Sequence, residues 1–127
     1  MVSLNDKKVL IVGATGGIGS EAAALISKHT SNLFLTGRRS EELKKVADRC
    51  EVPEDQVFQL DITQPGEVAS VAEKIHDQIG ALDVLVNAAG IGIIKKLDKL
   101  EPEEFSQNID VNLKGTFYLL KSFLPPM

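Results

Sequence analysis

Cysteine, histidine and long apolar runs are scarce in this sequence. The 127 residues contain one cysteine, Cys50, and two histidines, so an internal disulfide is excluded and no metal site is expected. A lone thiol is typical of a reducing, cytoplasmic compartment. No apolar run approaches the roughly 20 residues of a membrane-spanning helix, and the polar residues 1–8 do not resemble a signal peptide. We therefore expect a cytoplasmic protein with no membrane partner.

Positive charge is in short supply as well. Lys and Arg total 14 against 18 Asp and Glu, and the resulting net charge of −4 weighs against nucleic acid as a partner. With 43% apolar residues the chain has the composition of an ordinary globular domain, and its length leaves no room for a second one. We expect one domain over residues 1–127, in which any anionic ligand is held by local groups.

Four short apolar runs show no alternation with polar residues, which is typical of strands buried on both faces of a parallel sheet. These runs are 7–12, 33–36, 57–60 and 83–86. The stretches between them have apolar residues at helical spacing, in the first stretch at Ile18, Ala22, Leu25 and Ile26. Ser40 and Thr63 stand where the next two N-caps are expected, and Gly80 where the third helix should end. The alternation predicts an α/β fold in the order β-α-β-α-β-α-β-α.

A longer helix is predicted after the fourth strand, beginning near Pro102 and stopped by Pro125 and Pro126. It carries one apolar stripe, made of Phe105, Ile109, Leu113, Phe117, Leu120 and Leu124. No further strand follows, so the expected architecture looks truncated before a fifth strand.

A glycine-rich turn follows the first predicted strand and opens the first helix. It reads Gly13-Ala14-Thr15-Gly16-Gly17-Ile18-Gly19. Glycines at this spacing permit a tight turn, close approach of the backbone to a phosphate, and close packing of helix on strand, while the helix N-terminus attracts negative charge. The glycines can also be simple turn residues. A P-loop is excluded, because no Gly-Lys-Ser/Thr is present there.

Two arginines occupy the turn after the second predicted strand, where a dinucleotide site for NAD places an acidic residue on the ribose. The chain reads Thr36-Gly37-Arg38-Arg39-Ser40 and has no carboxylate in this turn. A guanidinium pairs with phosphate oxygens, whereas a carboxylate repels them. The pair therefore favours the 2′-phosphate of NADP and makes NAD a less favoured cofactor. The alternative is that both arginines are solvated loop residues.

Four motifs, in order along the chain, resemble those of the short-chain dehydrogenases/reductases. They are the glycine turn at 13–19, Asp61 after the third predicted strand, Asn87-Ala88-Ala89-Gly90 after the fourth, and Asn112 within residues 110–117. The resemblance covers essentially the whole chain and implies a Rossmann-type parallel sheet with strand order 3-2-1-4. Val12 and Ala88 depart from the family pattern, in which a threonine and a second asparagine are frequent.

The resemblance also implies roles for individual residues. The cofactor-binding set comprises Gly13, Thr15, Gly16, Gly17, Ile18 and Gly19 at the phosphates, Arg38 and Arg39 at the 2′-phosphate, Asp61 and Ile62 at the adenine, and Asn87, Ala88, Ala89 and Gly90 along the ribose. Asn112 matches the catalytic-site asparagine whose backbone interrupts the long helix and helps to hold a water in a proton relay. A satisfied structural role for Asn112 remains an alternative, because an unpaired amide beside apolar residues is costly.

The family's catalytic tyrosine, with a lysine four residues later, has no match in this chain. The single tyrosine is Tyr118, and Ser122 stands four residues after it. The family's serine, tyrosine and lysine follow a fifth strand. We therefore expect the 127 residues to be the N-terminal half of such a reductase and to be inactive alone.

Three functions stay open. The chain is similar to 3-oxoacyl-acyl-carrier-protein reductases around Asn112, which implies an NADP(H)-dependent oxidoreductase that moves hydride between nicotinamide and a carbonyl or alcohol, such as a 3-oxoacyl thioester. A second hypothesis is a non-catalytic NADP-binding module. The third is a self-associating fragment, a homo-oligomer formed through the long helix around Asn112 or through the exposed edge of the fourth strand.

Overall fold

Four parallel strands form the sheet at the centre of the computed structural model, which describes residues 3–127. The predicted domain 1–127 also includes Met1 and Val2, which lie outside the described residues. The strands are β1 (Val9–Val12), β2 (Leu33–Gly37), β3 (Val57–Gln59) and β4 (Val84–Asn87). They lie in the order β3-β2-β1-β4, which confirms the expected α/β sheet and its strand order.

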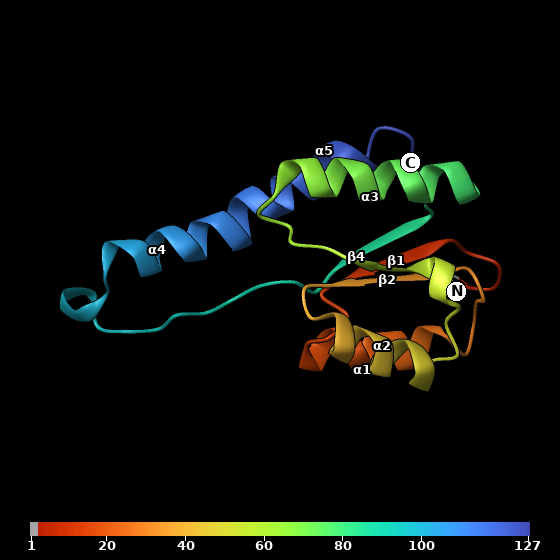
Figure 1. The fold of residues 1–127 in the computed structure, drawn as a ribbon, viewed down its shortest axis with the longest axis horizontal. Helices are drawn as coiled ribbons and strands as arrows, with labels where there is room; N and C mark the ends of the chain where they lie inside the picture. The colour runs from red at the N-terminus through yellow and green to blue at the C-terminus, as the bar shows by residue number, and fades with distance from the viewer. Residues whose placement is uncertain (1–2) are drawn as a thin grey trace.

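The central strand β1 is buried on both faces, as its uninterrupted apolar run predicts. Val9 pairs in register with Leu33 of β2 on one side and with Val84 of β4 on the other. Successive residues of the strand face opposite sides of the sheet. Ile11 belongs to the core cluster formed with α1 and α2, and Leu10 to the cluster formed with α3 and α5. Figure 1 shows these two helix layers on either side of the sheet.

Three helices connect the strands. They are α1 (Gly17–Ile26), α2 (Ser40–Arg49) and α3 (Pro65–Ile79), with a short 3-10 turn, η1 (Glu54–Gln56), before β3. The two predicted N-caps are wrong, because Ser40 is already the first residue of α2 and Thr63 lies one residue before the actual cap, Gln64. The Thr63 hydroxyl instead donates to Asp61 Oδ1 at 2.8 Å, a local bond that competes with capping. Gly80 ends α3 with a φ of +71°, as expected.

The predicted long helix is not α-helical throughout. After a 3-10 turn, η2 (Leu97–Lys99), it comprises α4 (Pro102–Ile109), a π-helical segment η3 (Asp110–Gly115) and α5 (Thr116–Phe123). The wider π turn contains Asn112, whose carbonyl accepts a hydrogen bond of 2.8 Å from the Thr116 hydroxyl. The resemblance implied an interruption of the long helix at this asparagine.

The apolar stripe of this long helix faces solvent. Its exposed members, with exposed fractions between 44% and 63%, are Phe105, Leu113, Phe117, Leu120 and Leu124. The face that packs on the sheet and α3 carries other residues, namely Val111, Gly115, Leu119 and Phe123. An apolar stripe normally marks the packed face of a helix. Here it forms a second apolar surface outside the core.

Beyond the sheet, α4 and the segment 90–101 project together as an arm (Figure 1). The helix α4 contains no buried residue, and in the segment Ile94 and Leu97 are 94% and 88% exposed. The arm therefore has no hydrophobic core of its own. Within residues 3–127, every helix is too short or too polar to cross a membrane.

Candidate functional site

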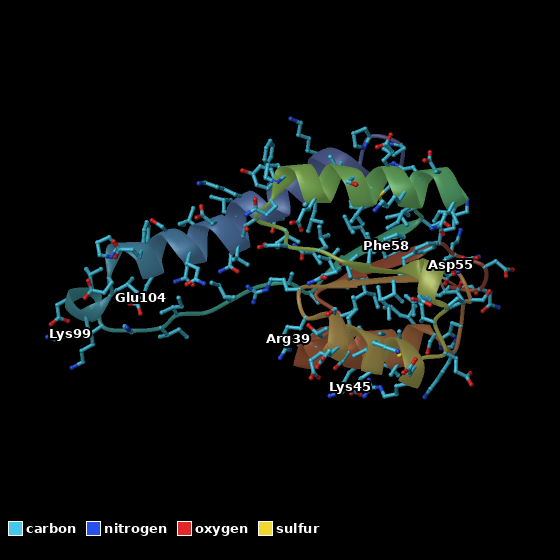
Figure 2. All side chains as sticks on the ribbon, in the orientation of Figure 1. Arg39, Lys45, Asp55, Phe58, Lys99 and Glu104 are labelled. Atoms are coloured by element: carbon cyan, nitrogen blue, oxygen red, sulfur yellow. The ribbon has the colours of Figure 1, made fainter. Side chains whose placement is uncertain are left out.

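A cavity of about 230 Å³ opens at the carboxyl ends of β1, β2 and β4. Its lining consists of Val12, Gly13, Thr15, Gly16, Gly37, Arg38, Arg39, Leu60, Asp61, Ile62, Ala88, Ala89, Gly90, Ile91 and Val111. The usual ligand site of an open parallel sheet is this crevice, where the strand order reverses between β1 and β4. Figure 2 shows Arg39 at this end of the sheet, near the start of the arm.

The glycine turn after β1 is tied to β2 through the backbone. The N–H groups of Gly13 and Ala14 both donate to the Thr36 carbonyl, at 3.1 and 2.9 Å. Gly13 has a φ of +79°, and a Cβ there would lie 2.5 Å from the Ala89 nitrogen, so the position requires glycine. A Cβ on Gly19 would overlap the Gly13 carbonyl oxygen. Gly19 therefore lets α1 pack closely on the turn.

The N-terminus of α1 is open. No side chain caps it at Gly16, and a Cβ on Gly17 would meet no atom within 4 Å. The N–H groups of a first helical turn, at the positive end of the helix, are suited to bind an anion. Of the residues predicted at the phosphates, Gly13, Thr15 and Gly16 line the cavity, and Gly17, Ile18 and Gly19 lie outside its lining.

Both arginines after β2 border the cavity. Arg39 Nη2 donates to the Thr15 carbonyl at 3.4 Å, which places its guanidinium across the glycine turn. The Arg38 carbonyl accepts a hydrogen bond of 2.8 Å from Gln59 Nε2, so the neighbouring strand β3 supports the turn. The lining contains one carboxylate, Asp61, beside these two guanidinium groups. The local balance is positive, although the chain as a whole is acidic.

Asp61 and Ile62 follow β3 and form one wall of the cavity. Asp61 Oδ1 accepts two hydrogen bonds from Thr63, at 2.9 Å from its N–H and at 2.8 Å from its hydroxyl. The Asp61 N–H donates to Glu67 Oε2 at 3.0 Å. These bonds orient the Asp61 side chain and leave its Oδ2 without a donor among the described residues. Apolar lining comes from Leu60, Ile62, Ile91 and Val111.

The segment after β4 is held by two asparagines. Asn87 Nδ2 donates to the Thr116 hydroxyl oxygen at 3.1 Å, and its Oδ1 accepts from the Ala89 N–H at 3.2 Å. Asn112 Oδ1 accepts the N–H of Ile91 at 2.9 Å, while its Nδ2 donates to the Ile91 carbonyl at 2.7 Å. The Asn112 amide is thus engaged with the backbone. The predicted residues that line the cavity here are Ala88, Ala89 and Gly90.

Some lining residues were missed by sequence reasoning, namely Val12, Gly37, Leu60, Ile91 and Val111. All of these except Val111 are next to a predicted site residue near the end of a strand, so their position in the sequence could have indicated them. Val111 also has a predicted neighbour, Asn112, but the spacing of the long helix did not show that Val111 faces the cavity. It does so because η3 packs against the end of the sheet.

Tyr118 lies on α5 outside the cavity lining and packs against the core cluster, with its ring centroid 5.8 Å from that of Phe117. Within residues 3–127, no group of three His, Cys, Asp or Glu side chains is placed to hold a metal ion. The cavity offers backbone amides, two guanidinium groups and apolar walls. This combination suits an anionic ligand with a flat apolar part.

A family model described as short chain dehydrogenase matches residues 7–127. The chain belongs to the short-chain dehydrogenase family. An uncharacterized oxidoreductase of Staphylococcus saprophyticus is 36% identical over 127 residues, covering 100% of this chain and 52% of the relative. An uncharacterized oxidoreductase of Staphylococcus aureus strain MRSA252 is 33% identical, covering 100% of this chain and 55% of the relative. This short-chain dehydrogenase chain therefore spans about half the length of the curated relatives it matches.

Solved structures of the same family share the fold. A short-chain type dehydrogenase/reductase from Mycobacterium ulcerans superposes with a TM-score of 0.89 at 26% identity, covering 99% of this chain and 48% of that one. A short-chain dehydrogenase/reductase from Brucella melitensis superposes with a TM-score of 0.88 at 27% identity, covering 97% of this chain and 51% of that one. The likeness confirms the Rossmann-type fold that the resemblance implied.

Proposed function

We propose that this chain forms the nucleotide-binding part of an NADP(H)-dependent oxidoreductase that transfers hydride between nicotinamide and a carbonyl or alcohol. Membership of the short-chain dehydrogenase family supports a nicotinamide cofactor, and the curated relatives are named as oxidoreductases. One observation carries the choice of NADP over NAD. Arg38 and Arg39 border the cavity at the turn after β2, and no carboxylate stands in that turn.

The phosphates of such a cofactor fit the glycine turn. The open N-terminus of α1 presents N–H groups, and the space beside Gly17 allows a phosphate to approach the backbone. The 2′-phosphate would meet Arg38 and Arg39, whose planar donor forks match phosphate oxygens. Such local donors are needed, since the net charge of the chain is −4 and repels anions at a distance.

The adenosine end fits the apolar part of the cavity. Ile62 and Val111 offer two apolar surfaces, and the Oδ2 of Asp61 is an acceptor for an exocyclic amino group. Gly90 and Ile91 would form the wall along the ribose, held by the side chain of Asn112. All these contacts use residues of this chain alone, so we expect it to bind an adenine nucleotide without any other segment.

NADPH, when bound, supplies the hydride. This chain would bind the cofactor and orient it, and the Asn112 carbonyl, in the π-helical segment, would accept a hydrogen bond from a water of the proton relay. The relay's acid is not among these residues, because Ser122 rather than a lysine stands four positions after Tyr118. We therefore infer that the chain alone is a binding module. Reduction of a carbonyl substrate, such as a 3-oxoacyl thioester, would require a longer protein that also supplies the acid.

Calorimetry with 2′-phospho-ADP and ADP tests this proposal. We expect the wild-type chain to bind 2′-phospho-ADP about tenfold more tightly than ADP, because charge-assisted hydrogen bonds to the 2′-phosphate are made by the arginines alone. Arg38→Ala should lose most of this preference while its affinity for ADP stays unchanged. NADPH mixed with the chain and a simple keto ester should not be oxidised.

Lys45→Ala is the matched control, because it also removes one positive charge. Lys45 lies on α2 (Figure 2), pairs with Glu42 at 3.2 Å and is outside the cavity lining. It should retain the wild-type preference. Equal wild-type affinities for the two nucleotides would contradict the role of the arginines, and binding of neither would contradict the nucleotide site itself.

A further inference from the structure

The arm is held together by side chains of α4 and η3 that bind the backbone of the segment leaving β4. Figure 1 shows this segment running out from β4 and the helix returning toward the sheet. Asn108 Oδ1 accepts the N–H of Ile93 at 3.2 Å, and Asn108 Nδ2 is 3.4 Å from the Ile93 carbonyl and 3.1 Å from the Glu104 carbonyl. Asn112 makes the same pair of bonds to Ile91. Two asparagines one helical turn apart thus bind alternate residues of the segment.

A third contact continues the series. The Lys95 ammonium binds the Glu104 carboxylate, so helix residues 104, 108 and 112 meet segment residues 95, 93 and 91. Four helical residues rise about 6 Å, and two extended residues advance about 6.6 Å. The rise of one helical turn and the advance of two extended residues are thus nearly equal. Each successive turn of the helix can therefore contact every second residue of the segment.

The asparagine amides take the place of a neighbouring strand. In an extended chain, alternate residues direct both their N–H and their carbonyl to the same side. An Asn side chain supplies one acceptor and one donor, as the backbone of a paired strand would. The segment therefore has its backbone satisfied at Ile91 and Ile93 without a strand beside it.

This arrangement fixes one wall of the cavity. Ile91 and Gly90 line it, and a Cβ on Gly90 would lie 3.2 Å from Asn112 Oδ1, so the backbone passes close to the helix. Ile91 packs partly against the core cluster, but the segment beyond it has little apolar packing, since Ile94 is 94% exposed and α4 buries no residue. The direction in which the segment leaves Ile91 depends on the bonds made at Ile93.

We propose that Asn108 is a positioning residue for the nucleotide cavity, acting through Ile93 to hold the Gly90–Ile91 wall against the ribose side of the ligand. The proposal rests on the function proposed above. Asn108 does not itself line the cavity. Asn108 acts on the cavity through the backbone that connects Ile93 to Ile91. This effect adds to that of Asn112, which binds Ile91 directly.

The test compares Asn108→Ala with Asn108→Asp in the 127-residue chain, using amide hydrogen exchange by NMR and calorimetry with NADPH. Asn108→Ala should raise exchange at Ile93 at least tenfold and raise the Kd for NADPH about fivefold, as loss of a backbone-holding hydrogen bond predicts. Asn108→Asp keeps the acceptor for the Ile93 N–H but lacks the donor. It should therefore preserve the protection of the Ile93 amide, and its affinity for NADPH should lie between those of the wild type and Asn108→Ala.

Gln78→Ala is the control, because it also removes a side-chain amide that binds the backbone, here the Asp55 carbonyl at 2.9 Å, and Gln78 lies on α3 outside the cavity lining. It should leave both the exchange at Ile93 and the affinity unchanged. An Asn108→Ala chain that exchanges faster at Ile93, or melts at a lower temperature, and yet binds NADPH within twofold of wild type would overturn the positioning role alone. A wild-type chain that does not bind NADPH would overturn the proposed function and this inference together.

Discussion

At the scale of single residues, the glycine motif serves two separate demands. Gly19 is confined by packing, since a Cβ there would overlap the Gly13 carbonyl oxygen. Gly17, two positions earlier, has open space around it. The sequence motif does not distinguish the two, because both are glycines in the same turn. The structure assigns Gly19 to close contact between α1 and the turn after β1, and leaves Gly17 facing open space.

Gly19→Ala should therefore lower the free energy of unfolding by about 1–3 kcal/mol, the usual range for an overpacked site. Gly17→Ala should change it by less than about 1 kcal/mol, because alanine is tolerated in a helix with free space. Urea titration of the two variants measures the difference. Equal effects of the two substitutions would contradict the packing role assigned to Gly19.

At the scale of elements, the arm shows how a helix can be held by polar contacts. The Lys95 ammonium lowers the pKa of Glu104 from its ordinary value of 4.5, with a smaller contribution in the same direction from the Glu101 N–H. A depressed folded-state pKa means that the contact stabilises the arm fully above pH 4.5 and is lost as the pH falls through the folded value. The two asparagine contacts carry no titratable group.

Acidification should therefore open the arm from its tip. Below about pH 4.5, amide exchange at Glu101, whose N–H donates to Glu104 Oε2 at 3.1 Å, should rise relative to its rate at pH 6 after correction for intrinsic exchange, while Ile91 and Ile93 keep their protection. Glu104→Gln should show the raised exchange at both pH values. Parallel loss of protection at all three amides would contradict separate contacts and indicate cooperative opening of the whole arm.

At the scale of the whole molecule, the exposed stripe of the long helix is the feature that the fold does not use internally. Contiguous exposed apolar side chains are typical of interaction surfaces. Phe117 and Leu113 are 57% and 63% exposed on one face of η3 and α5. A second surface open to another copy is β4, which forms one of the two edges of the sheet. We propose that two chains associate through the stripe.

Sedimentation at high protein concentration should accordingly show a dimer for the wild-type chain and a monomer for Phe117→Glu. Leu25→Glu is the control, because Leu25 is 62% exposed on α1, away from the stripe. It should remain dimeric. A dimer that survives Phe117→Glu would point to pairing of β4 edges instead, and a monomeric wild type would exclude both surfaces.

Local patterns in the amino-acid sequence were enough to predict the positions of the strands, the glycine turn, and the two arginines after β2. Each of these is a local pattern: an uninterrupted apolar run, glycines at fixed spacing, a turn directly after a strand. Helix faces were less well predicted. In α1 the apolar positions Ile18 and Leu25 are 82% and 62% exposed, whereas Gly19 and Ala23 are buried. The small residues Gly19 and Ala23 form the buried face of α1 because they allow the helix to approach the sheet closely. A search for large apolar residues at helical spacing does not identify such a face.

Contacts between residues far apart in the chain could not be predicted from such local patterns. Val111 reaches the cavity because η3 crosses the end of the sheet, and Asn108 finds Ile93 because the arm folds back on itself. No nearby sequence pattern predicts either contact. An asparagine on a helix, for example, is equally compatible with exposure to solvent. These contacts follow from non-local packing, in which the partner of a polar group is set by how elements far apart in the chain are brought together.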